Sequence, residues 1–194
     1  MLLIPCRDVS GADWITGSDL PWEQLVTFGP REFPGYARLR FLPDPTSPGE
    51  KEPRLEVEGP VEHPLLRSAV NLLTEHTRTP EDAYFCMWDG WGTPVALQAL
   101  PKVVVPERSY FLFRGSLSDL DDWNSQGIAG LPTDFAVPPP AFMWPEDHAW
   151  CVALDVDSHF AGIGATTEAI AALVAHPGLD VIAADPNEEQ PSYG

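Results

Sequence analysis

Proline is the residue that most constrains the fold of this chain. The 194 residues include 22 prolines, about twice the usual share of roughly 5%, and these are scattered along the whole sequence. Proline removes a backbone donor and clashes with the preceding turn of a helix, so it interrupts helices and is tolerated in sheets only at edges and bulges. We therefore expect few long helices and many short strands, turns and ordered loops.

The remaining composition is that of a protein with a substantial core. Hydrophobic residues make up 44% of the chain and charged residues 21%, which is close to ordinary globular usage. The length favours one domain, which we place at residues 1–184. Residues 44–60 are rich in Pro, Glu and Gly and are predicted to form an exposed loop. Residues 185–194 are predicted to be a disordered acidic tail.

The clearest secondary-structure signals are two strands and two helices. Residues 83–88 and 110–113 are apolar in both side-chain directions, which is typical of strands covered on both faces. Residues 64–77 carry apolar side chains at helical spacing after Pro64. A second helix is expected to begin at Thr166 or Thr167 and to end near residue 176.

Other strands follow from shorter patterns. We predict strands over residues 36–42, 95–100, 103–105 and 179–183, and one long strand over residues 149–160. Gly162 and Gly164 are expected to turn the chain after that strand. The fold class predicted from these elements is α+β, with one mixed, largely antiparallel sheet of about five or six strands and two main helices.

The charge of the chain restricts its partners. It has 29 acidic against 11 basic residues and a formal net charge of −18. A surface this negative repels nucleic-acid phosphates and anionic membranes and favours basic partners or cations. The N-terminal apolar run is too short for a signal sequence and no segment is long enough to span a membrane. We therefore expect a cytoplasmic protein with no nucleic-acid or membrane partner.

The cysteines and glycines give no cofactor signal. Cys6, Cys86 and Cys151 are widely spaced and odd in number, which favours reduced, mostly buried thiols over a disulfide framework. The Gly162-Ile-Gly164 segment lacks the third glycine of a dinucleotide fingerprint, because Thr167 stands at that position. We expect no cofactor and no metal site.

Two tryptophans form the first candidate binding site. Trp88 and Trp91 flank Asp89 and Gly90 in a turn that follows a predicted buried strand. Tryptophan in such a turn can anchor a protein partner or stack on a ligand. The structural alternative is that both rings fold back onto the edge of the core.

The second candidate site is a polar face on the strand predicted at residues 149–160. Asp155, Asp157 and His159 share one side of that strand by its period of two. Two carboxylates and an imidazole can bind a divalent cation or perform acid–base chemistry. The alternative is a solvated face, or ion pairs from Asp155 and Asp157 to Arg38 and Arg40 on a neighbouring strand.

Four segments of the chain resemble a family of small acidic actinobacterial proteins. These segments are Asp44–Gly49, Phe85–Gly92, Tyr110–Gly115 and Trp144–Val152. The resemblance covers most of the chain but implies no activity, substrate or site.

Two functional hypotheses follow. The first is a non-enzymatic protein-interaction module, for example of an immunity or antitoxin kind, that presents an acidic surface bearing Trp88 and Trp91 to a basic protein. The second is a small enzyme or ligand-binding domain that uses Asp155, Asp157 and His159, with or without a divalent cation. A mimic of DNA ranks last, because the chain lacks long acidic helices.

Overall fold

The two segments that are apolar on both faces lie at the centre of one half of the sheet. The computed structural model describes residues 3–30, 32–53, 62–92, 94–123, 127–132, 134–156 and 158–194. In it, β3 (Ala83–Trp88) pairs on one side with β5 (Arg108–Gly115) and on the other with β6 (Phe142–Pro145). The first five residues of β3 are all buried. The predicted burial on both faces is confirmed for this strand.

The described residues form one sheet of nine strands, in which every pair of strands is antiparallel. Its order is β1-β5-β3-β6-β7-β8-β2-β9, with β4 also paired to β5. The α+β class and the antiparallel pairing are as expected, but the sheet is larger than the predicted five or six strands. Several strands are only two to four residues long, too short to show an alternating pattern. The remaining strands are β1 (Ile4–Pro5), β2 (Gly35–Arg40), β4 (Lys102–Val105), β7 (Cys151–Ala153), β8 (Phe160–Ala165) and β9 (Val181–Ala183).

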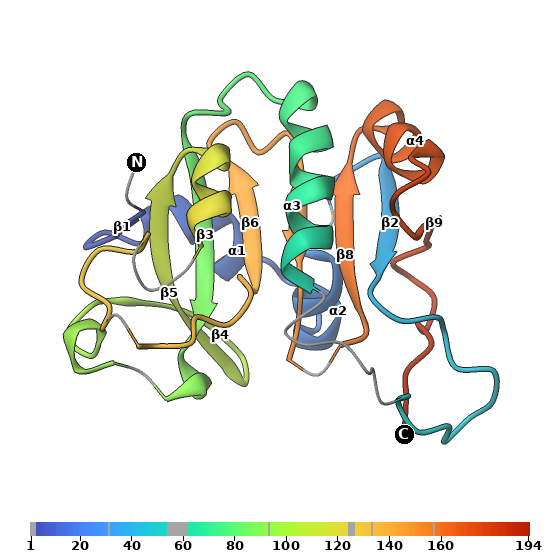
Figure 1. The fold of residues 1–194 in the computed structure, drawn as a ribbon, viewed down its shortest axis with the longest axis horizontal. Coiled ribbons are helices and arrows are strands. Elements are labelled where there is room, and N and C mark those ends of the chain that lie inside the picture. The colour runs from blue at the N-terminus through green and yellow to red at the C-terminus, as the bar shows by residue number, and fades with distance from the viewer. Residues whose placement is uncertain are drawn as a thin grey trace.

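Helices cover both faces of this sheet (Figure 1). On the face toward the viewer lie α3 (Glu62–Leu73), α4 (Thr167–Ala175) and the 3-10 helix η5 (Leu117–Asp122), and behind it lie α1 (Asp13–Thr16) and α2 (Trp22–Phe28). Both long predicted helices are present, and Thr166 caps α4 by accepting a hydrogen bond from the Ala169 amide. Four further 3-10 turns are η1 (Ser10–Ala12), η2 (Thr74–His76), η3 (Asp89–Trp91) and η4 (Val95–Leu97).

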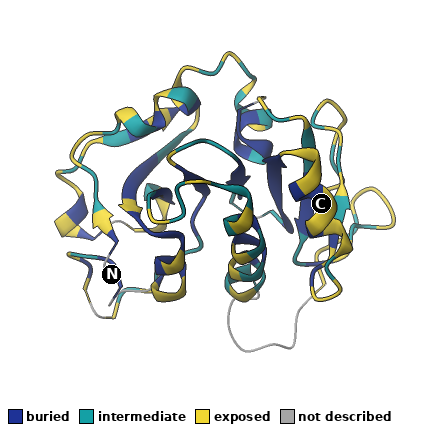
Figure 2. Cartoon of the chain, turned by 90° about the horizontal axis from the view of Figure 1, so that it is seen from above, coloured by how far each residue is buried: buried dark blue, intermediate teal, exposed yellow. Residues whose placement is uncertain are grey.

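The side chains of the central strands β3, β5, β6 and β7 alternate between two cores. Phe85 and Met87 belong to the core under α3 and α4, whereas Tyr84 and Cys86 belong to the core under α1 and α2. Figure 2 shows the buried strands between helices whose outer surfaces are exposed. An apolar pattern in both directions is therefore what this three-layered arrangement requires.

The long strand predicted at residues 149–160 is wrong. The described residues instead form two strands, β7, which ends at Ala153, and β8, which begins at Phe160. Gly162 and Gly164 lie inside β8 instead of turning the chain. Because they lack side chains, they allow α2 and the segment after it to pack closely against β8. A Cβ on Gly162 would lie 1.9 Å from the Thr27 carbonyl oxygen. The strand predicted at residues 95–100 is also wrong, since η4 begins directly after Pro94.

One end of the sheet gathers several segments that are distant in sequence. β3, β7 and β2 end there, and β6 and β8 begin there, because neighbouring strands run in opposite directions. This end is the lower edge in Figure 1, where α3 begins and the C-terminus lies. We call residues 185–194 the C-terminal segment; its Tyr193 hydroxyl donates to the Pro43 carbonyl oxygen at 2.7 Å.

Candidate binding site

The two tryptophans of the first candidate site lie in contact but differ in exposure. Trp88 is the half-buried last residue of β3, whereas Trp91 in η3 is 52% exposed. Their rings meet edge to face, with centroids 5.6 Å apart. Gly90 permits this turn, since a Cβ there would lie 2.2 Å from a Trp88 ring atom. Trp91 is therefore the more accessible of the two rings to a partner.

The Trp88 ring instead packs against an arginine of the same chain. The Arg108 guanidinium lies 5.1 Å from the Trp22 ring centroid and 5.7 Å from that of Trp88. Its Nε and Nη2 donate to the two carboxylate oxygens of Asp155 at 3.0 and 3.3 Å. The structure thus brings Trp88 and Asp155 together through Arg108, a residue that the sequence analysis did not select.

Asp89 is held in a second ion pair. Its Oδ2 lies 2.5 Å from Nζ of Lys102 on β4, and the same ammonium lies 5.2 Å from the Phe111 ring centroid. The pair fixes the start of η3 against β4. Asp89 therefore positions the tryptophan turn.

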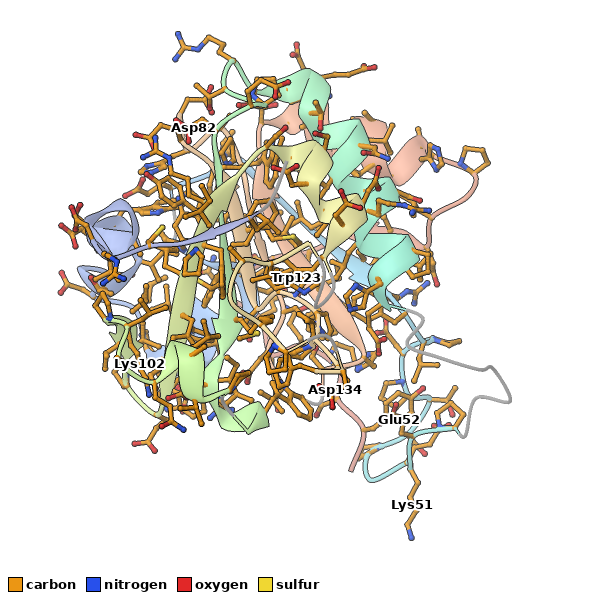
Figure 3. All side chains as sticks on the ribbon, turned by 60° about the vertical axis from the view of Figure 1, so that its left-hand side comes forward. Lys51, Glu52, Asp82, Lys102, Trp123 and Asp134 are labelled. Carbon is orange, nitrogen blue, oxygen red and sulfur yellow. The ribbon has the colours of Figure 1, made fainter. Side chains whose placement is uncertain are left out.

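A cleft of about 280 Å³ lies beside these tryptophans, and we call it the Trp cleft. Its described lining residues include no lysine or arginine, and one oxygen of Glu62, Oε2, is buried with no hydrogen-bond partner among the described residues. Figure 3 shows Glu52 on the loop after β2, and the neighbouring Lys51 extends away from the domain. The tryptophans and acidic groups that line this cleft are Trp88, Trp91, Glu52, Glu62 and Asp155.

A larger cleft of about 490 Å³, the His159 cleft, lies between α2, residues 155–160 and the C-terminal segment. His159 is 6% exposed and lies in the connection between β7 and β8. Asp155 lines the same cleft, so the structure brings these two predicted residues together, although on a connection and not on a strand. Asp157 lies outside the described residues.

His159 belongs to a partly buried polar network centred on Asp44. Its Nε2 lies 3.1 Å from Oδ1 of Asp44, and Arg38 donates to both Asp44 oxygens at 2.6 and 3.0 Å. Arg40 donates to the same carboxylate at 3.1 Å and pairs with Asp180 at 2.7 Å. Arg38 and Arg40 are thus paired with Asp44 and Asp180, and Asp155 with Arg108, so the alternative that linked Asp155 to Arg38 or Arg40 is wrong.

The surroundings of Asp44 favour its ionised form. Burial raises the pKa of this carboxyl group, but hydrogen bonds from Arg38, His159 and Arg40 outweigh it and hold the pKa well below its usual range. Arg38 is 5% exposed, so its charge depends on Asp44 for compensation. The network is therefore a structural element that supports one wall of the His159 cleft.

Other reactive groups give little sign of chemistry. Cys86 and Cys151 are fully buried, and burial raises the pKa of both thiols, which keeps them protonated and poorly nucleophilic. Within the part of the chain that the structure describes, no three His, Cys, Asp or Glu side chains are gathered to hold a metal ion. No described helix is both long and apolar enough to cross a membrane.

Comparison with known proteins gives no relative from which a function can be transferred. No family model matches the chain, and neither a curated protein nor a solved structure shows significant similarity to it.

Proposed function

We propose that this protein is a non-enzymatic interaction module that binds a basic protein partner, with the Trp cleft as its anchoring site. The observation that carries the proposal is the combination, in one cleft, of the exposed Trp91 ring with the carboxylate side chains of Glu52 and Glu62. Glu52 is exposed, so a guanidinium or ammonium group from a partner can pair with it and stack on Trp91.

The chain itself provides the pattern for such recognition. Arg108 lies against Trp88 and binds Asp155 at the edge of the same cleft. An arginine of a partner would repeat this arrangement with Trp91 and Glu62. The net charge of −18 would accelerate association with a basic protein and make it sensitive to salt. An immunity or antitoxin-like role is one form of such a function.

The test is capture of a partner from an extract of the source organism at low and high salt, followed by affinity measurement with the purified partner. We expect a stoichiometric basic protein that high salt releases, and at least tenfold weaker binding by Trp91→Ala and Glu62→Gln. Val95→Ala is the matched control, because Val95 is 82% exposed but does not line the Trp cleft. Unchanged affinity of Trp91→Ala, or capture of no basic protein, would overturn the proposal.

The second candidate function is a small enzyme or ligand-binding domain that uses Asp155, Asp157 and His159. The observation that favours it is the contact of His159 with Asp44 on the wall of the larger cleft, since a carboxylate can orient a histidine for acid–base chemistry. Asp44 also accepts hydrogen bonds from Arg38 and Arg40, however, so it is not dedicated to His159. Thermal shift with Mg²⁺, Mn²⁺ and a set of small ligands tests this function. A rise in melting temperature that His159→Gln abolishes would support it.

A further inference from the structure

The Trp cleft and the His159 cleft have one wall in common. Asp155, Val156 and Ser158 line both of them. These residues belong to the short connection between β7 and β8, at the end of the sheet where α3 begins and the C-terminal segment lies. The two clefts are therefore adjacent and are separated by a single stretch of chain.

Both clefts have the chemistry that suits a cation. Each combines carboxylates with aromatic rings, and neither has a lysine or arginine among its described lining residues. In the His159 cleft the exposed Glu188 and Glu189 come from the C-terminal segment, and Tyr193 and Phe28 supply rings. The acidic side chains that line both clefts disfavour anionic ligands, although Asp155 is already paired with Arg108.

We propose that the partner presents a linear basic segment whose two cationic side chains enter the two clefts, one on each side of the wall that Asp155, Val156 and Ser158 form. This inference rests on the proposed function and adds the form of the epitope and a role for the C-terminal segment as the outer wall. A single extended chain is about 5 Å wide, and side chains two to four residues apart along it are roughly 7 to 13 Å apart. Two arginines with one to three residues between them match such a divided site.

Synthetic peptides provide the test. The probes are ten-residue Gly/Ser peptides, acetylated and amidated, with one arginine, with two arginines separated by one to three residues, or with two arginines at opposite ends. Calorimetry at low salt measures their affinity for the full chain. We expect the closely spaced pair to bind at least tenfold more tightly than the single arginine, and more tightly than the end-separated pair of equal charge.

Variants assign the two arginines to the two clefts. Glu188→Gln/Glu189→Gln should reduce the affinity for the paired peptide to that for the single arginine, and leave the single-arginine peptide unaffected. Trp91→Ala should weaken both peptides. Glu75→Gln/Glu168→Gln is the control, because it removes the same charge from exposed positions in η2 and α4, outside both clefts.

The outcomes separate this inference from the proposed function. If the paired and single peptides bind equally, or the Glu188/Glu189 variant behaves as its control does, the two-cleft inference is overturned while the Trp cleft stands. If the single-arginine peptide binds Trp91→Ala as tightly as the original protein, the anchoring role of the Trp cleft is overturned. Binding of no peptide overturns the linear epitope alone, and capture of a folded basic partner then decides the proposed function.

Discussion

Arg38 and Arg108 are held in similar ways at two places in this protein. Arg38 lies 4.9 Å from the Phe160 ring centroid and binds both oxygens of Asp44. Arg108 lies against Trp88 and binds both oxygens of Asp155. In each place an arginine, an aromatic ring and a carboxylate meet at the same end of the sheet.

The two places differ in which side chains remain accessible to a binding partner. Around Arg38 the components are mostly buried, and Asp44 accepts hydrogen bonds from Arg38, Arg40 and His159. Around Arg108 the neighbouring Trp91 is 52% exposed, and the exposed Glu52 lines the same cleft. The first region is complete within the chain and should contribute to stability, whereas the second leaves a ring and a carboxylate for recognition.

The largest stability effect should come from Asp44→Asn. This change leaves the buried Arg38 guanidinium without its compensating charge, which costs about 3–5 kcal/mol of unfolding free energy. Urea denaturation measures the loss. Asp180→Asn is the control, because the Asp180 side chain is 49% exposed and its loss should cost at most about 1 kcal/mol. Equal effects of the two substitutions would show that the Asp44 network is not a buried structural unit.

The same network should make stability depend on acid. The folded-state pKa of Asp44 lies below its unfolded value of about 3.9, so its contribution is fully present above that value and is lost as the pH falls toward the folded pKa. The difference in unfolding free energy between the original protein and Asp44→Asn should therefore narrow from pH 5 to pH 2.5. A constant difference across this range would contradict the role of the Asp44 charge.

A smaller effect is expected where the second arginine is removed. Arg108→Leu leaves Asp155 partly buried without its donors, which should cost about 1–3 kcal/mol in denaturation experiments. Arg78→Leu is the comparison, since the Arg78 side chain is 91% exposed and its removal should change stability by less than about 0.5 kcal/mol. If Arg108→Leu is equally neutral, the pair with Asp155 does not support the shared wall of the two clefts.

The smallest effect on stability should come from Trp91→Ala. The ring is half exposed and packs edge to face on Trp88, so its removal should cost no more than about 0.5–1.5 kcal/mol. The variant should nevertheless lose binding to a basic partner. A loss of stability above about 3 kcal/mol, in the range of a core aromatic residue, would place Trp91 with the structural region and remove the contrast between the two places.

Much of the fold could be predicted because its signals are local. The two-sided apolar pattern of residues 83–88 predicted a covered strand, and helical spacing after Pro64 predicted α3. The split of residues 149–160 into two strands could not be predicted in this way. Residues on both sides of the break favour strand, and Asp155 is bound outside the sheet by Arg108, 47 positions away.

The candidate site was predictable only in part. The pattern around Trp88 and Trp91 identified the aromatic turn, and the partial alternation of residues 36–42 placed Arg38 and Arg40 on one face. Asp44, which pairs with both arginines, was assigned to an exposed loop, and its contact with His159 spans 115 positions. No local pattern signals such a pair.

The sequence by itself determined a helix-poor α+β chain with doubly covered strands and a strongly acidic composition. Proline and hydrophobic periodicity act on neighbouring residues, and net charge is a sum over the chain, so none of them depends on the tertiary structure. Only the tertiary structure decided which tryptophan is more exposed, which carboxylates are already paired, and that Asp155, Val156 and Ser158 line two adjacent clefts. These properties depend on contacts between residues far apart in the chain, which exist only once the sheet has brought its strand ends together.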